Sequence, residues 1–211
     1  MLSHPRTARN GNRIASVGML IAIIATVYIG TDLNLIKISI AMITGSIIGA
    51  FFAIRVQMTQ MPQLVAIFNG FGGGASALVA SSEFLKIQPT NIDTSTFLII
   101  SIVLSILVGT LTFTGSFIAF GKLQGLITTK PVTFKGQQLI NALLAIIMVI
   151  SAIMIPSYGI TSFYIILGLS ALLGILLVIP IGGADMPVVI SLLNSYSGIA
   201  AAMTGFVLVQ S

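Results

Sequence analysis

The chain has 211 residues, of which 56% are hydrophobic and only 6% are charged, and its formal net charge is +5. Its mean hydropathy is +1.14, whereas an ordinary soluble domain carries roughly 25% charged residues, so the composition indicates an integral membrane protein. The absence of cysteine excludes disulfides, thiolate catalysis and cysteine-ligated metals, and one histidine with four acidic residues provides no metal site. The basic residues lie between apolar segments, which favours anionic lipid headgroups over nucleic acid as their neighbours.

A basic leader, residues 1–13, precedes seven apolar segments that are each long enough to cross ~30 Å of hydrocarbon as a helix. We expect spans at roughly 14–30, 34–54, 62–82, 96–120, 137–156, 160–180 and 186–208. The first span should be retained, because its apolar run exceeds the core of a signal peptide and no cleavage site follows. The segments lack the alternation of barrel strands, so the predicted fold is an all-α polytopic bundle without a soluble nucleotide-binding domain.

The distribution of Lys and Arg predicts the orientation of these spans. If the spans alternate, one side receives seven basic residues and the other receives only Lys37 and Lys86. The seven are Arg6, Arg9, Arg13, Arg55, Lys122, Lys130 and Lys135. Positive charge accumulates on the cytoplasmic side, so the N-terminus should be cytoplasmic. As a separate expectation, the membrane should be a prokaryotic plasma (inner) membrane.

Two of the predicted spans begin with a similar sequence pattern, M-P-Q-L-V-A-I-F-N at 61–69 and M-P-V-V-I-S-L-L-N at 186–194. Proline suits a first helical turn, and each asparagine lies seven residues later, ~10 Å along its helix. The positions four, seven and eleven residues beyond each asparagine share its helical face and carry small side chains. They are Gly73, Ser76 and Ala80 in one helix, and Gly198, Ala201 and Gly205 in the other.

A third span carries a similar stripe, formed by Ser101, Ser105, Gly109, Thr112 and Ser116. The spacings of three and four residues place these side chains on one helical face, so three polar or small faces could converge on one hydrated seam. Ordinary helix packing is the alternative, because small residues and hydroxyls commonly line interfaces between membrane helices, and an asparagine can simply bond across such an interface.

Acidic and basic side chains are absent from the middle of every predicted span, since all four acids fall in loops or at helix edges. A neutral interior cannot store a proton, so a titrating group would have to come from a partner chain. The glycines at 70–74 lie inside a span and do not form a dinucleotide-binding loop, which needs a preceding strand. Asp185 precedes the last span, either as a carboxylate near the helix N-terminus or as a charged lip at a cytoplasmic pore mouth.

Four sequence blocks closely resemble the membrane domain of the beta subunit of proton-translocating NAD(P) transhydrogenase. They are T-A-R-N-G-N at 7–12, Q-M-T-Q-M-P-Q-L-V-A-I-F-N-G-F-G-G-G at 57–74, T-F-T-G-S-F-I-A-F-G-K-L-Q-G at 112–125 and G-G-A-D-M-P-V-V-I-S-L-L-N-S-Y-S-G at 182–198. The blocks are ungapped, and the resemblance runs over nearly the whole chain.

This resemblance implies a complex in which partner domains bind NAD(H) and NADP(H), while the membrane domain conducts protons coupled to hydride transfer. The chain would lack the first and last membrane helices of the family and its NADP(H)-binding domain, so it would bind no cofactor and catalyse no hydride transfer alone. The expected partners are the alpha subunit, the NADP(H)-binding domain and a second copy of the whole complex.

The resemblance also implies roles for individual residues. Asn194 and Asp185 match positions associated with proton passage and with signalling to the NADP(H) domain, and Ser116 falls in a matching block. Some relatives carry a proton-relaying histidine where this chain has Asn69, whereas others resemble this chain and receive a histidine from the alpha subunit.

The sequence thus predicts a proton path formed by Asn69, Asn194, Ser105, Thr112 and Ser116, with Asp185 at its cytoplasmic mouth. Three glycines should allow close helix packing along it, namely Gly73, Gly109 and Gly198. Two other functions fit the same features. They are an independent transporter or channel for a small polar solute, and a membrane anchor of a redox complex that conducts nothing.

Overall fold

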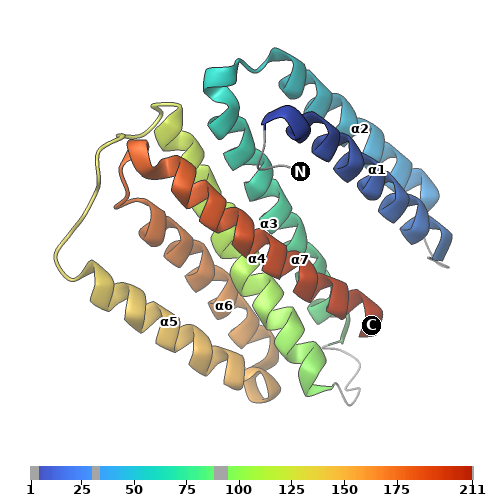
Figure 1. Ribbon diagram of the computed structural model, residues 1–211. Coiled ribbons are helices and arrows are strands. Elements are labelled where there is room, and N and C mark those ends of the chain that lie inside the picture. Colours follow the sequence, from blue (N-terminus) through green and yellow to red (C-terminus); the bar gives the residue numbers. More distant parts are fainter. Residues whose placement is uncertain (1–4, 30–33, 88–94, 211) are drawn as a thin grey trace. The chain divides into compact units, whose positions relative to one another are not determined.

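The computed structural model describes residues 5–29, 34–87 and 95–210, in which seven α-helices and two short 3-10 turns form an all-α fold (Figure 1). The helices are α1 (Pro5–Ile29), α2 (Leu35–Arg55), α3 (Met61–Ile87), α4 (Thr96–Leu123), α5 (Gln137–Ile153), α6 (Ile155–Val178) and α7 (Met186–Gln210). The 3-10 turns η1 (Met58–Gln60) and η3 (Gly183–Asp185) directly precede α3 and α7. The predicted all-α polytopic bundle is therefore confirmed.

Six of these helices are long and apolar enough to cross a membrane, and α5, with 17 residues, is the shorter exception. Helix α1 begins at Pro5, inside the stretch expected as a leader. The expected span at 160–180 starts just after Gly159, where a φ of 41° interrupts the helical geometry of α6. This conformation favours glycine, which explains why the regular part of α6 begins there.

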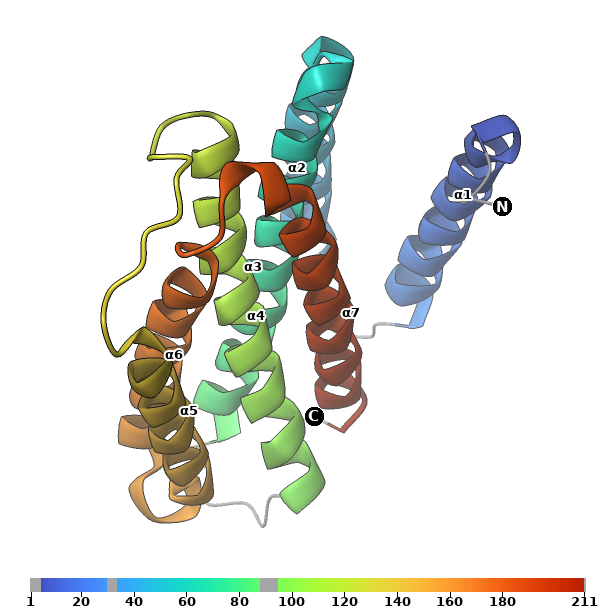
Figure 2. The ribbon, with the colours of Figure 1, turned by 60° about the vertical axis from the view of Figure 1, so that its left-hand side comes forward.

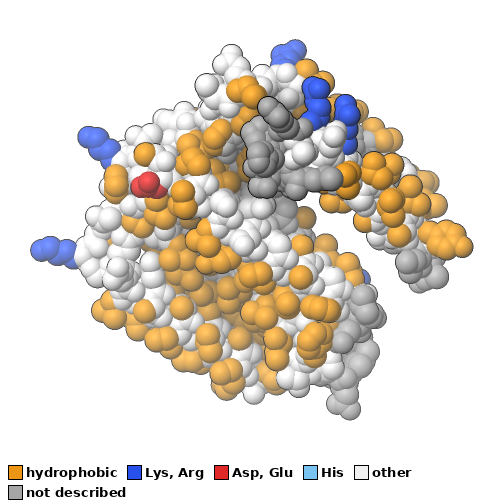
Figure 3. Space-filling view, viewed as in Figure 1, with side chains coloured by type: hydrophobic (Ala, Val, Ile, Leu, Met, Phe, Trp, Pro, Cys, Tyr) orange, Lys and Arg blue, Asp and Glu red, His pale blue; other side chains and the backbone are white. Residues whose placement is uncertain are grey.

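The chain divides into two compact units, Met1–Arg55 and Val56–Ser211. The first unit contains α1 and α2, and none of the described residues of α2 is buried. The second unit contains the remaining helices, and in it hydrophobic side chains cover broad areas of the outward helix faces (Figure 3). Such surfaces suit contact with lipid or with other membrane helices.

Helix α4 is the central element of the second unit. It packs against α3, α6 and α7, while α3 also packs against α7 and α5 lies along α6 (Figures 1 and 2). Ser95 caps α4, because its side chain accepts a hydrogen bond from the backbone N–H of Leu98. Two clusters of buried apolar residues surround α4, one containing Leu111 and Leu193 and the other containing Ile102 and Val207. The neutral polar residues of the sequence stripe lie among these clusters.

Helices α3 and α4 approach each other closely at two glycines. A Cβ atom added to Gly73 would lie 2.8 Å from the carbonyl oxygen of Gly109, and one added to Gly109 would lie 2.6 Å from that of Gly73. Gly198 of α7 differs from this expected packing role, because among the described residues no atom of a neighbouring helix lies within 4 Å of its Cβ position. The close contact therefore joins α3 to α4 and does not involve the α7 glycine.

Candidate functional site

Asn69 lies at the centre of a hydrogen-bonded layer that joins three helices. Its side-chain N–H donates to the hydroxyl of Ser116 on α4 at 3.0 Å, and its side-chain oxygen accepts from the hydroxyl of Ser197 on α7 at 2.8 Å. Asn69 and Ser116 are buried, and Ser197 is half-buried. A buried amide is costly unless both of its ends find partners, so this layer accounts for an asparagine at this depth.

A second polar layer lies two helical turns further along the same seam. The hydroxyl oxygens of Ser105 on α4 and Thr204 on α7 are 2.6 Å apart. The Ser105 hydroxyl is also 3.2 Å from the carbonyl oxygen of Ser76 on α3, and that of Thr204 is 2.9 Å from the carbonyl oxygen of Ala200. The seam between α3, α4 and α7, called the polar seam below, thus contains two layers with the same three-helix composition.

Further hydroxyls extend the polar seam without completing a hydrogen bond inside it. Thr112 and Ser101 are buried on α4, and their hydroxyl oxygens have no partner among the described residues. Thr112 lies between the two layers in the α4 sequence, and Ser101 lies beyond the second layer. Buried hydroxyls normally find a hydrogen-bond partner, so these two leave hydrogen-bonding capacity unused inside the polar seam.

The α7 side of the polar seam differs from the prediction. Asn194 is exposed in this chain, and the small residues that share its face are exposed as well, namely Gly198, Ala201 and Gly205. Leu193, Ala200 and Val207 are buried at intervals of seven residues, and they turn that face away from α3 and α4. The expected meeting of Asn69 with Asn194 inside the bundle is therefore wrong, and Ser197 takes the position opposite Asn69.

Asp185 belongs to η3, directly before α7, and its side chain is exposed without a hydrogen bond among the described residues. The preceding glycines form a turn whose Gly183 N–H donates to the carbonyl oxygen of Thr129 at 2.8 Å. This bond connects the Gly182–Asp185 turn, called the lip below, to the loop that follows α4. The exposed carboxylate is therefore held at one end of the bundle by neighbouring backbone.

Lys122 anchors the segment directly before the lip to the loop after α4, a function that the sequence did not reveal because this residue was counted only as a cytoplasmic charge. Its side chain is 1% exposed, and its ammonium donates to the carbonyl oxygens of Ile179 at 2.6 Å, Ile181 at 2.8 Å and Lys130 at 3.1 Å. Three N–H donors thus meet three acceptors, one of which is the carbonyl of Ile179 at the C-terminal end of α6, which also accepts the backbone N–H of Val132 at 3.2 Å. The only sequence signal was its place within the F-G-K-L-Q-G block.

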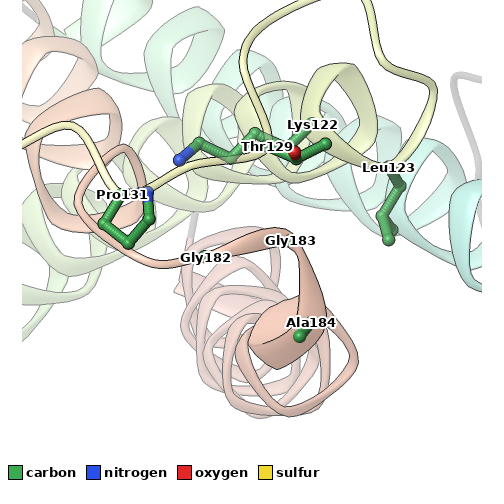
Figure 4. Close-up of a pocket in the computed structure, with 7 residues that line it drawn as sticks. All are labelled: Lys122, Leu123, Thr129, Pro131, Gly182, Gly183 and Ala184. Carbon is green, nitrogen blue, oxygen red and sulfur yellow. The ribbon is translucent and has the colours of Figure 1, made fainter.

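An open pocket of about 550 Å³ adjoins this anchor. Figure 4 shows the Lys122 side chain extended along the 129–131 segment, beside the turn of Gly182 and Gly183. The pocket is lined by Lys122, Leu123, Thr129, Pro131, Gly182, Gly183 and Ala184. The loop after α4, the lip and the end of α4 therefore form one connected surface next to Asp185.

Glu83 is a second functional candidate that the sequence reasoning left aside as a helix-edge residue. It lies inside α3, is 8% exposed, and pairs with the ammonium of Lys86 at 2.8 Å. Its position fourteen residues beyond Asn69 places it on the same helical face.

These features define a class of protein, a polytopic integral membrane protein with a neutral polar seam between three of its helices. The family model described as the NAD(P) transhydrogenase beta subunit matches residues 1–211, and the chain belongs to this family. The chain is 46% identical over 212 residues to the NAD(P) transhydrogenase subunit beta of Rhodospirillum rubrum, covering 98% of this chain and 46% of the relative. A strain of the same species provides a second relative with the same identity and coverage.

The chain thus spans about half the length of the curated relatives it matches. Family membership argues against an independent transporter or channel, since the match runs over the whole chain.

Proposed function

We propose that this chain conducts protons across the membrane as part of NAD(P) transhydrogenase, coupled to hydride transfer from NADH to NADP+ in other domains of the complex. The observation that carries this proposal is the pair of three-helix polar layers around Asn69 and Ser105. Each layer uses a donor and an acceptor from different helices, in helices otherwise suited to hydrocarbon.

The polar seam supplies a path whose hydrogen bonds can reverse direction. Hydroxyls donate and accept, so the bond between Ser105 and Thr204 can point either way. The amide of Asn69 can orient water and hydroxyls, but it does not titrate and cannot hold the proton. Bound water next to the hydroxyls of Thr112 and Ser101 completes the path between and beyond the layers when α3 and α4 move apart at Gly73 and Gly109.

The exposed face of α7 fits contact with a membrane helix of the alpha subunit. An amide directed at hydrocarbon is unfavourable, and the small residues beside Asn194 allow another helix to approach closely. A histidine on that helix would supply the titrating group that the centre of this chain lacks. Asn194 then serves the proton path through the subunit interface.

The lip and the Lys122 anchor fit the cytoplasmic mouth of the path, where the NADP(H)-binding domain would dock. Lys122, Lys130 and Lys135 all lie at this end, which follows the preference of positive charge for the cytoplasmic side. We therefore place the N-terminus in the cytoplasm of a prokaryotic cell, with Asp185 at the mouth. NAD(H) and NADP(H) bind to partner domains, and two copies of the complex associate.

The test is Asn69→Leu in the complete complex, reconstituted into proteoliposomes with nucleotides on the outside. We expect proton pumping to fall at least about tenfold, because leucine removes the donor and the acceptor that join the first layer. Gln138→Leu is the matched control, since Gln138 is an exposed amide on α5 outside the polar seam. Pumping that is equal in the two variants would remove the basis of this proposal.

A further inference from the structure

The buried face of α3 continues beyond the two polar layers to a carboxylate. Asn69, Gly73, Ser76, Ala80 and Glu83 follow one another at spacings of four, three, four and three residues, and all five are buried. Such spacing keeps them on one helical face, about 21 Å long at ~1.5 Å per residue. Glu83 therefore ends the same stripe on which Asn69 begins.

The register between the helices places Glu83 at the next level of the polar seam. Asn69 bonds Ser116 of α4, and the Ser76 carbonyl bonds Ser105, so α4 runs antiparallel to α3. The residue numbers of the two paired positions add up to 185 in the first pair and to 181 in the second. Glu83 is then level with residues 98–102 of α4, which include Ser101 with its unpartnered buried hydroxyl.

Helix α7 follows the same register. Ser197 bonds Asn69 and Thr204 bonds the Ser76 carbonyl, and both pairs are 128 positions apart. The polar layers thus recur every seven residues on α3, and Glu83 occupies the third such position.

Among the described residues, the surroundings of Glu83 contain little charge. Lys86, one turn further along α3, pairs with its carboxylate at 2.8 Å while the Lys86 side chain itself remains 68% exposed. At this level Leu98, Ser101 and Ile102 of α4 are uncharged, whereas the register of α7 leads to residue 211, which lies outside the described residues. The carboxylate of Glu83 is thus buried toward the polar seam, whereas the side chain of Lys86 extends to the surface of the bundle.

We propose that Glu83 is the proton-binding group at the end of the polar seam remote from Asp185. A proton from that side of the membrane binds a carboxylate oxygen to give the neutral acid, and it leaves to the seam beside Ser101 when the carboxylate re-forms. This inference rests on the proposed function and adds to it a titratable group within the chain.

The test uses Glu83→Gln, which keeps the size of the side chain but cannot titrate, in the complete complex in proteoliposomes. We expect pumping to fall at least about tenfold and its dependence on the pH of the Lys86 side to disappear. Glu83→Asp, which keeps a carboxylate, should restore both. Infrared difference spectra between two pH values should show the carbonyl band of a protonated acid in the parent protein, and Glu83→Gln should remove it.

Lys86→Gln separates proton binding from a structural ion pair. It removes the pair but keeps the carboxylate, so pumping should persist, whereas a purely structural pair predicts the same loss in Lys86→Gln and Glu83→Gln. The rate of hydride transfer, measured after an ionophore has made the membrane permeable to protons, shows whether each variant complex has assembled. If Glu83→Gln does not assemble, three other measurements test the role of Glu83. They are the pH dependence of pumping in Glu83→Asp, the same dependence in Lys86→Gln, and the infrared band of the parent protein, whose absence would refute proton binding by Glu83.

Asn69→Leu in the same preparation distinguishes the two proposals. If Asn69→Leu abolishes pumping while Glu83→Gln leaves its rate and pH dependence unchanged, the role of Glu83 is refuted and the proposed function stands. If neither variant alters pumping, both are refuted.

Discussion

The contact between Gly73 and Gly109 makes a quantitative prediction for Gly109→Ala. The new Cβ would lie 2.6 Å from the carbonyl oxygen of Gly73 and 3.0 Å from the backbone nitrogen of Ala77, whereas ordinary contact begins at 3.4 Å. Both neighbours are backbone atoms, so α3 and α4 must separate by about 0.8 Å, the difference between 3.4 and 2.6. Forced overpacking of this kind costs about 1–3 kcal/mol.

The same displacement reaches the Asn69 layer, two turns away on α4. The bond between Asn69 and Ser116 is 3.0 Å long, and an increase of 0.8 Å would take it beyond hydrogen-bonding distance, with the loss of about 1 kcal/mol more. We therefore expect Gly109→Ala to unfold at lower temperature and to pump more slowly. Thermal loss of the assembled complex in detergent, followed by size-exclusion chromatography, measures the first effect.

Gly72→Ala is the matched control for this experiment. Gly72 is exposed on α3, and no atom lies within 4 Å of its Cβ position, so its replacement should change stability by less than about 0.5 kcal/mol. Equal thermal stability of Gly72→Ala and Gly109→Ala would refute the close approach of α3 and α4.

Three further predictions concern the anchor, the second layer and the exposed face of α7. Lys122→Met should destabilise the complex by about 3 kcal/mol, because it removes the buried ammonium and its hydrogen bonds to three carbonyls. Lys130→Met at an exposed side chain should not, as chemical denaturation in detergent would show. Ser105→Ala should slow pumping and cost about 1 kcal/mol, while Ser195→Ala on the exposed side of α7 serves as its control; equal pumping would contradict a role for the second layer. Asn194→Cys, in a chain without native cysteine, should cross-link to the alpha subunit with a short bifunctional reagent, and Leu172→Cys on α6 should not.

The sequence predicted the α3 and α4 faces of the seam because spacing alone determines which residues share a helical face. Asn69 and Gly73 on α3, and Ser105 and Ser116 on α4, are all buried at this interface. The rotation of α7 was not predictable in the same way, because small residues occur on both of its faces. Two faces of α7 could pack against α3 and α4, the one with Asn194 and the one with Ser197, Ala200 and Thr204. The packing of Leu193 against α4 selects the second face.

The Lys122 anchor lay beyond sequence reasoning for a different physical reason. Its acceptors are backbone carbonyls of residues 8, 57 and 59 positions away, so no side-chain pattern signals them. Glu83 was missed because the loop after α3 was expected to begin near residue 82, whereas α3 continues to Ile87. The longer helix turns an edge residue into the last member of the buried face.

The glycine contact also constrains how a proton could pass along the seam. In this conformation Gly73 and Gly109 touch between the Asn69 layer and the Ser105 layer, so helix backbone occupies the space that a water chain would need. Glycines leave no side chains to interlock, and two helices in contact through them can slide or separate with little steric resistance. Conduction therefore requires a small movement of α3 against α4. Lys122 lies at the end of α4 and donates to the carbonyls of Ile179 and Ile181, directly before the lip, so a domain that displaces the lip would pull on the helix that carries Gly109.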